Sequence, residues 1–177
     1  MKHALDFATS NRLELEILLQ HYTYDSLKLE AAKFLIRNMP HCYSYQQGGE
    51  MDSVKRVRTY YSPFGQIDQT YARRWGHYTY RNLPKIYDAH IITAEYLIDN
   101  IDRAFDNWQK RPWNRSLSFE DFCEYLLPYR IGDEPLEEWR ELYEKKYGYL
   151  LDSIYKGSDV VEAANLVSRH LQEPVFI

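Results

Sequence analysis

The strongest pattern in the sequence is an amphipathic one that runs through residues 94–108. Apolar side chains recur there every three or four positions over four turns, at Ala94, Leu97, Ile98, Ile101, Phe105 and Trp108. This spacing places them on one face of an α-helix, and Pro112 follows where a helix has to end. Because an apolar face of this length must be covered by other elements, we predict a central helix in a packed domain.

Six further segments have the same helical spacing: residues 15–22, 27–35, 67–78, 119–127, 136–154 and 160–171. N-cap residues precede three of them, namely Asn11, Asp25 and Ser118. Pro135 falls in the first turn of the longest segment, where proline is favoured. Trp139, Tyr143 and Tyr147 lie on one face of this segment, which we expect to meet the core. Glycine is scarce, at 7 of 177 residues, which suits a chain with few turns.

These segments predict an all-α fold, an irregular multi-helix bundle of about seven helices. The length suits a single helical domain over residues 1–177 with a sizeable core. A weak alternation at Val57, Thr59 and Tyr61 allows one exception, a short hairpin near residues 54–61.

Composition excludes several classes of protein. A net charge of -4 is too mild to indicate nucleic acid as a partner. With a mean hydropathy of -0.62 and no apolar run near the roughly 20 residues of a membrane span, we do not expect an integral membrane protein. Scattered histidines and the lack of a Gly-rich phosphate loop indicate no metal or nucleotide cofactor. No leader pattern is visible, so either the protein is cytoplasmic or a leader lies outside this sequence.

Two groups of residues could carry chemistry. Acidic side chains follow one face of the central helix, at Glu95, Asp99, Asp102 and Asp106, and we interpret them as its solvated side rather than a metal site. Cys42 and Cys123 are the only thiols. Cys123 lies among apolar residues and indicates core filling, whereas Cys42 follows His41 in a loop and lacks the spacing of a catalytic dyad.

A third group could form an interaction surface. Residues 51–90 hold seven Lys or Arg against three Asp, a net charge of +4, together with eight aromatic residues. Such a stretch could stack on a glycan or contact a protein, or its arginine stems could simply cover aromatic packing. Pro128 ends a helix and leaves Tyr129 and Arg130 in a loop, either for interaction or with Arg130 capping the helix end. The candidate surface is Tyr60, Tyr61, Trp75, Tyr78, Tyr80, Trp113, Tyr129 and Arg130.

Several long segments resemble one protein family. They include AAKFLIRNMP at residues 31–40, ITAEYLIDNID at 92–102, SFEDFCEYLLPYR at 118–130 and EPLEEWR at 134–140. These segments are similar to the helical region that opens large transglutaminase-like proteins of the papain-like superfamily in Bacteroidetes. Residues 43–85 carry little of the resemblance.

The resemblance implies a helical region that precedes a cysteine catalytic core with a Cys, His and Asp triad. It also implies a location outside the cytoplasm, in the periplasm or at the cell surface. The Gly-x-Cys helix start of that core and its His and Asp segments are not among these 177 residues, so no catalytic residue carries over. We therefore expect a noncatalytic accessory domain whose partner is such a core in the same or a neighbouring polypeptide. The alternative is a module that binds glycan, peptidoglycan or protein through residues 51–90.

Overall fold

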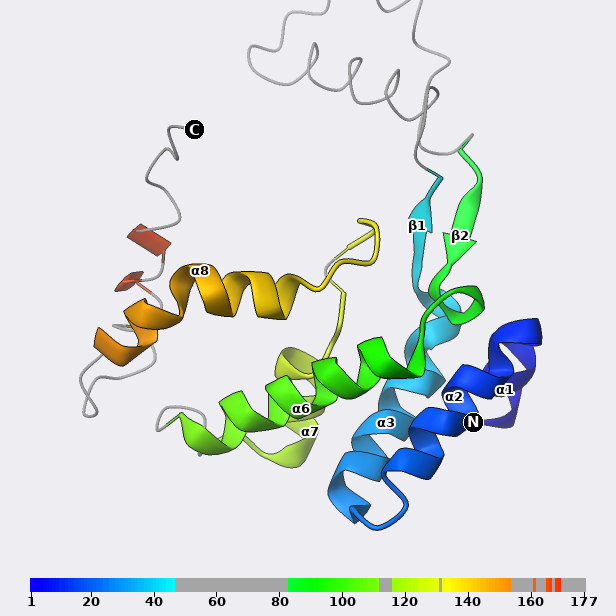
Figure 1. Ribbon diagram of the computed structural model, residues 1–177, viewed down its shortest axis with the longest axis horizontal. Helices are drawn as coiled ribbons and strands as arrows, with labels where there is room; N and C mark the ends of the chain where they lie inside the picture. The colour runs from blue at the N-terminus through cyan, green and yellow to red at the C-terminus, as the bar shows by residue number, and fades with distance from the viewer. Residues whose placement is uncertain are drawn as a thin grey trace, which may run out of the picture. The chain divides into compact units, whose positions relative to one another are not determined.

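A computed structural model describes residues 1–46, 83–111, 116–130 and 132–153, with residues 161, 165, 166, 168 and 169 (Figure 1). Most of these residues are helical, and two short strands accompany the helices. The mainly helical character matches the prediction, whereas the bundle of about seven helices stays a prediction. The expected hairpin near residues 54–61 and the expected helix over 67–78 lie outside the described residues.

The chain divides into two compact units. One contains Met1–Glu16, Ile36–Ile92 and Arg130–Leu136, and the other contains Ile17–Leu35, Thr93–Tyr129 and Glu137–Ile177. The helices α2 (Arg12–His21) and α3 (Ser26–Asn38) contribute residues to both units. Asp25 accepts a hydrogen bond from the backbone N–H of Lys28 at 3.1 Å, which confirms it as the start signal of α3.

A pair of short antiparallel strands belongs to the first unit. Strand β1 (Tyr43–Tyr45) pairs with β2 (Lys85–Tyr87), with Ser44 opposite Ile86. The backbone N–H of Gln46 donates to the carbonyl of Pro84 at 2.9 Å and extends the pairing. The sequence analysis did not predict this sheet, because three residues are too few to establish an alternating pattern.

Side chains near the N-terminus hold the first unit together. Helix α1 (Lys2–Phe7) is followed by the turn η1 (Thr9–Asn11). The Nδ2 of Asn11, at the end of this turn, donates to the carbonyls of Ala89 at 3.1 Å and Ile92 at 2.8 Å. Those carbonyls flank the end of the turn η4 (Asp88–His90). The amide of Asn11, expected only as a helix cap, therefore fixes a connection about 80 residues away in sequence.

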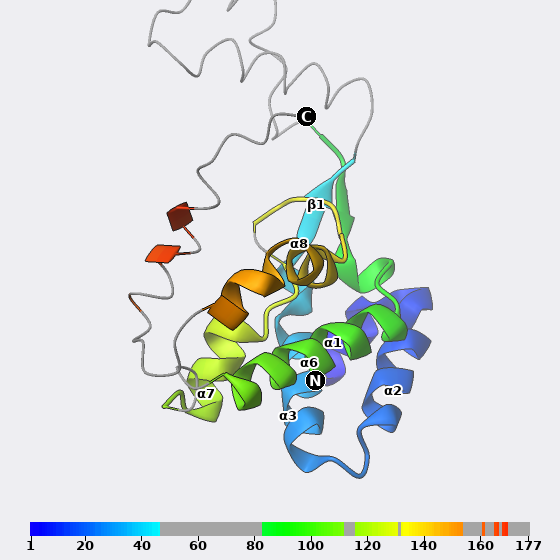
Figure 2. The same ribbon diagram turned by 60° about the vertical axis from the view of Figure 1, so that its left-hand side comes forward.

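Helix α6 (Ala94–Lys110) is the longest described helix of the second unit (Figure 2). The hydroxyl of Thr93 accepts from the N–H of Tyr96 at 3.2 Å and caps its first turn. Its buried residues are Ala94, Leu97, Asn100, Ile101, Ala104 and Phe105, which confirms the predicted apolar face. Ile98 and Trp108 are half-buried at its edge.

The segment after residue 117 contains an unusual turn. Helix α7 (Phe119–Asp121) starts as predicted, since the hydroxyl of Ser118 accepts from the N–H of Asp121 at 3.0 Å. It continues into the π-helix η6 (Phe122–Leu126), in which the N–H of Leu127 donates to the carbonyl of Phe122 at 2.9 Å. The ring of Phe122 stacks on Trp108, with 4.4 Å between the ring centroids, and joins this turn to α6.

Helix α8 (Trp139–Ser153) starts three residues later than the predicted segment 136–154. The carbonyl of Glu137, in the segment expected to be helical, accepts instead from the hydroxyl of Tyr96 at 2.9 Å. This tertiary bond competes with a helical start at Pro135. Tyr143, expected to face the core, is 50% exposed, so that part of the prediction is wrong. In the described parts of the chain, no helix is both long and apolar enough to cross a membrane.

Candidate functional site

Six of the eight predicted interaction residues lie outside the described residues. They are Tyr60, Tyr61, Trp75, Tyr78, Tyr80 and Trp113. Their role in an interaction surface stays a prediction. The other two, Tyr129 and Arg130, are described and can be placed.

Tyr129 is buried, with only 4% of its surface exposed. Its carbonyl accepts from the indole N–H of Trp139 at 2.8 Å and from the hydroxyl of Tyr96 at 3.3 Å. The rings of Tyr96 and Tyr129 meet edge to face, with centroids 6.2 Å apart. The expectation that Tyr129 is left on an exposed loop is therefore wrong, because two aromatic side chains use its backbone as a docking point.

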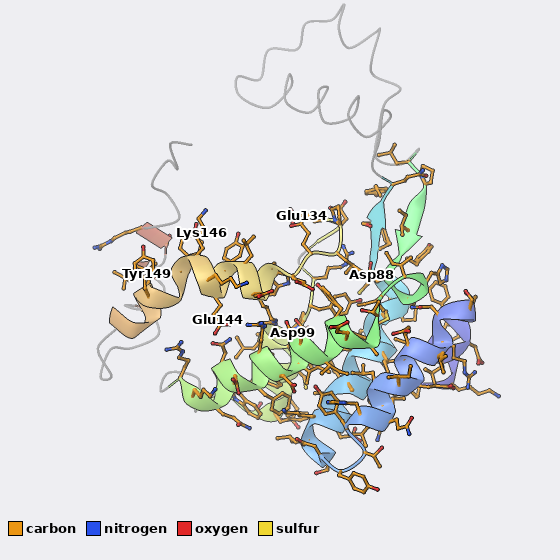
Figure 3. All side chains as sticks on the ribbon, in the orientation of Figure 1. Asp88, Asp99, Glu134, Glu144, Lys146 and Tyr149 are labelled. Atoms are coloured by element: carbon orange, nitrogen blue, oxygen red, sulfur yellow. The ribbon has the colours of Figure 1, made fainter. Side chains whose placement is uncertain are left out.

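Arg130 is also buried, and its partner is Asp88 in the first unit. Its Nε and Nη2 donate to the two carboxylate oxygens of Asp88 at 2.6 and 2.7 Å, a bidentate pair. Nη1 donates to the carbonyls of Gly132 and Glu134 at 3.2 and 2.5 Å. Figure 3 labels Asp88 and Glu134 at this cluster. The side chain of Arg130 is 8% exposed and that of Asp88 is fully buried, so Arg130 neither faces solvent nor caps a helix end.

Arg140 takes the capping role that was considered for Arg130. Its Nη2 donates to the carbonyls of Leu126 and Pro128, the latter at 3.0 Å, at the end of the π-helix η6. Its Nε donates to the side-chain oxygen of Asn100 at 2.6 Å. Burial lowers the pKa of the Arg140 guanidinium to about 10, because no salt bridge compensates its charge within the described residues. No sequence pattern distinguishes Arg140 from the exposed charged residues around it.

A groove of about 200 Å³ lies between α6 and α8, within the second unit. Its lining among the described residues is Asn107, Arg111, Trp139, Arg140, Tyr143, Glu144, Tyr147 and Gly148. The rings of Trp139, Tyr143 and Tyr147 follow one another along α8, with centroid separations of 6.3 and 5.6 Å. Their spacing of four residues is the reason that they share one side of the helix. This groove combines open aromatic surface with cationic side chains.

A second cavity of about 220 Å³ lies near the start of α8 in the same unit. Trp139 and Arg140 line both cavities, but the second one is dominated by carboxylates, at Glu95, Asp99, Glu137, Glu138 and Glu141. The two cavities therefore differ in charge and would admit different ligands.

Three of the four acidic residues of α6 form salt bridges. Asp99 accepts from Arg103 at 2.8 Å, and Arg103 also donates to Glu144 of α8 at 2.6 Å. Figure 3 labels Asp99 and Glu144 where α8 faces α6. The other pairs are Asp102 with Lys28 at 2.8 Å and Asp106 with Lys110 at 2.5 Å. The side chains of Asp99, Asp102 and Asp106 are 46%, 47% and 63% exposed, which supports the interpretation as a solvated face. No group of three His, Cys, Asp or Glu that could hold a metal occurs among the described residues.

Neither described thiol forms a disulfide. Cys123 is 3% exposed, and burial raises the pKa of its thiol to about 11. This confirms the predicted core-filling role of Cys123. The Sγ of Cys42 lies 3.7 Å from the carbonyl of Asn38 at the end of α3.

No family model, curated protein or solved structure matches this chain. The site therefore has to be interpreted from its own geometry.

Proposed function

We propose that this chain is a noncatalytic helical accessory domain that precedes, and packs on, a transglutaminase-like cysteine catalytic core. The core would lie in the same or a neighbouring polypeptide, in the periplasm or at the cell surface. The observation that supports this proposal is that distinctive residues of the segments 118–130 and 134–140 are buried and pack within the chain itself.

Three side chains of those segments illustrate this use. Phe122 is fully buried, Arg130 neutralises a buried Asp88, and Arg140 holds the end of the π-helix η6. Residues committed to buried hydrogen bonds fix a shape and are not available to react with a substrate. A chain that forms such bonds suits a scaffold that presents a defined surface to a neighbouring domain.

The thiols support a noncatalytic role. A cysteine nucleophile needs a stabilised thiolate, whereas a thiol with a pKa of about 11 is almost wholly protonated near neutral pH. Cys123 also lies next to Phe122, in the buried face of the π-helix η6. Its position is that of a packing residue.

The test of this proposal has two arms. The purified chain and its Cys42→Ala/Cys123→Ala variant are assayed for peptide hydrolysis and for glutamine-dependent cross-linking, and we expect neither protein to act. Turnover by the unaltered chain that disappears in the variant would overturn the proposal. In the second arm, a transglutaminase-like core is assayed with and without the chain, and a change in its stability or kcat/KM is expected.

The alternative function is binding of glycan, peptidoglycan or protein through residues 51–90. A contact of Lys85, which lies in the described part of this stretch, supports this alternative. Lys85 lies over the ring of Tyr43 on the paired strand, with its Nζ 3.8 Å from the ring centroid. A hydrogen bond to Tyr45, and then one to Lys85, lower the pKa of the Tyr43 hydroxyl. Tryptophan fluorescence titration against polysaccharides and peptidoglycan, repeated with Trp75→Ala, tests this alternative. No response to any of them would contradict glycan binding.

A further inference from the structure

We propose that the groove between α6 and α8 binds a sugar ring that carries a carboxylate. This inference goes beyond the accessory role and does not depend on it, because the groove lies within one unit of this chain. It also uses residues other than those of the stretch 51–90.

The aromatic wall of the groove is the first support. Trp139, Tyr143 and Tyr147 form a continuous strip along α8, and Tyr143 is half exposed although it is a large aromatic residue. The hydroxyls of Tyr143 and Tyr147 make no hydrogen bond within the part of the chain that the structure describes. Arg140 lies over the ring of Trp139 and Lys146 over that of Tyr147, so the ring of Tyr143 is the main stacking face. Such a face packs against the C–H face of a pyranose, and the hydroxyls can bond to its rim.

The charge of the groove is the second support. Glu144, its one described carboxylate, is already paired with Arg103 at 2.6 Å. Arg140 has no carboxylate partner among the described residues, and its Nε and Nη2 donate only to neutral oxygens. A guanidinium in this state favours an anion, and arginine matches the geometry of a carboxylate. The neighbouring cavity would repel an anion with its five carboxylates, which favours the groove as the place of binding.

Gly148 is the third support, and it is independent of the first two. It lies in the interior of α8, where glycine destabilises a helix relative to alanine. A Cβ atom added there would meet only the Cγ of Glu144 at 3.8 Å, an ordinary contact. Packing within the described protein therefore does not require glycine, and its lack of a side chain leaves the groove open beside Tyr147.

The size of the groove limits the ligand. Its volume of about 200 Å³ is below the roughly 300–1,000 Å³ of sites for drug-sized ligands. One or two sugar rings suit this volume, whereas a dinucleotide cofactor would not.

The test uses the full chain and isothermal titration calorimetry with two matched probes, digalacturonic acid and its neutral counterpart galactobiose. We expect the acidic disaccharide to bind and the neutral one to bind at least tenfold more weakly. No binding of either probe at millimolar concentration overturns the proposal. Equal binding of both overturns the role of the carboxylate.

Two variants of α8 test the location. Tyr143→Ala should abolish binding, whereas Tyr149→Ala should leave it unchanged, because Tyr149 is 61% exposed and outside the groove. Figure 3 shows Glu144 directed toward α6 and Tyr149 on another side of α8. Equal losses in the two variants overturn the assignment to the groove.

Gly148→Leu separates binding from stability. The added side chain should occupy the groove and weaken binding at least tenfold, while the melting temperature holds or rises because leucine favours a helix. Binding that survives this change overturns the proposal. Should the leucine variant fail to fold, Gly148→Ala is expected to move both quantities in the same directions by smaller amounts.

Discussion

Arg130 and Arg140 both bury a guanidinium, but the protein gives them different partners. Arg130 meets a carboxylate, Asp88, in a bidentate pair, so charge is matched by charge. Arg140 meets two backbone carbonyls and the oxygen of Asn100, and it forms no salt bridge among the described residues, although Asp99 attracts its charge from a distance. Arg130 therefore has a structural role only, whereas Arg140 retains a positive charge at the edge of a groove.

The two arginines show that hydrogen bonding and charge compensation are separate requirements for a buried guanidinium. Removing one partner of a buried ion pair leaves a buried charge without its counter-charge, whereas removing an arginine from neutral acceptors leaves only uncharged carbonyl groups without a donor. The two sites should therefore respond differently to substitution.

The largest effect is expected at the ion pair. Asp88→Ala leaves the Arg130 cation buried without its carboxylate, and we expect a loss of about 3–5 kcal/mol in the free energy of unfolding. Urea denaturation near neutral pH measures it. The double variant Asp88→Ala/Arg130→Met serves as the control and should recover much of the loss. A single-variant loss below about 1 kcal/mol would contradict the assignment of a buried pair.

A smaller effect is expected at the second arginine. Arg140→Met removes the donors to Leu126, Pro128 and Asn100 without leaving a charge, so the expected loss is about 1–3 kcal/mol. Lys145→Met, at an exposed position of α8, is the matched control and should stay within about 0.5 kcal/mol. A loss at Arg140 larger than that of Asp88→Ala would reverse the comparison.

The uncompensated charge should also appear in the pH dependence of stability. Burial lowers the pKa of Arg140 to about 10 in the folded protein, well below the usual value of an arginine. Below pH 10 the Arg140 guanidinium is protonated in both the folded and the unfolded state, and the folded state carries the full cost of burying its charge. Above it the folded state releases the proton first, so stability rises with pH until the unfolded state also titrates.

The measurement compares wild type with Arg140→Met at about pH 9 and about pH 11.5, so that other titrating groups cancel. Wild type should gain at most about 2 kcal/mol relative to the variant across this interval. A relative loss with rising pH would show that the charged form of Arg140 is favoured by folding.

The smallest effects concern a glycine near each arginine. Gly132 lies two positions after Arg130 and has a φ of +70°, a conformation that alanine adopts with strain. Gly132→Ala should therefore lower the free energy of unfolding by about 1 kcal/mol. Gly148, which lines the same groove as Arg140, lies in a helix, so Gly148→Ala should raise the free energy of unfolding by about 0.5–1 kcal/mol. Thermal melts compare the two variants, and shifts of the same sign would contradict this contrast.

Local patterns predicted the elements that depend on local interactions. The apolar spacing of α6 and the cap at Ser118 were both identified, because each is set by residues a few positions apart. The strands β1 and β2 and the π-helix η6 were missed, since nothing in so short a stretch distinguishes them from other structure. The late start of α8 depends on a bond from Tyr96, 41 residues away from Glu137.

The candidate site was harder to predict for the same reason. A loop after Pro128 suggested exposure, but Asp88, the partner of Arg130, is 42 residues away in sequence. The aromatic spacing at Trp139, Tyr143 and Tyr147 was visible, yet periodicity alone cannot tell a face that meets the core from one that lines a groove. Only the exposure of Tyr143 separates the two.

The pairing of β1 with β2 has a consequence for engineering this chain. It brings Tyr45 and Lys85 together across 40 positions of sequence, and the bond from Gln46 to Pro84 closes the end of the ladder. Because β1 and β2 pair in register, a turn of about four residues in place of residues 47–82 should connect them directly as a hairpin. The two strands thus mark a splice point at which most of the basic aromatic stretch can be exchanged as a cassette.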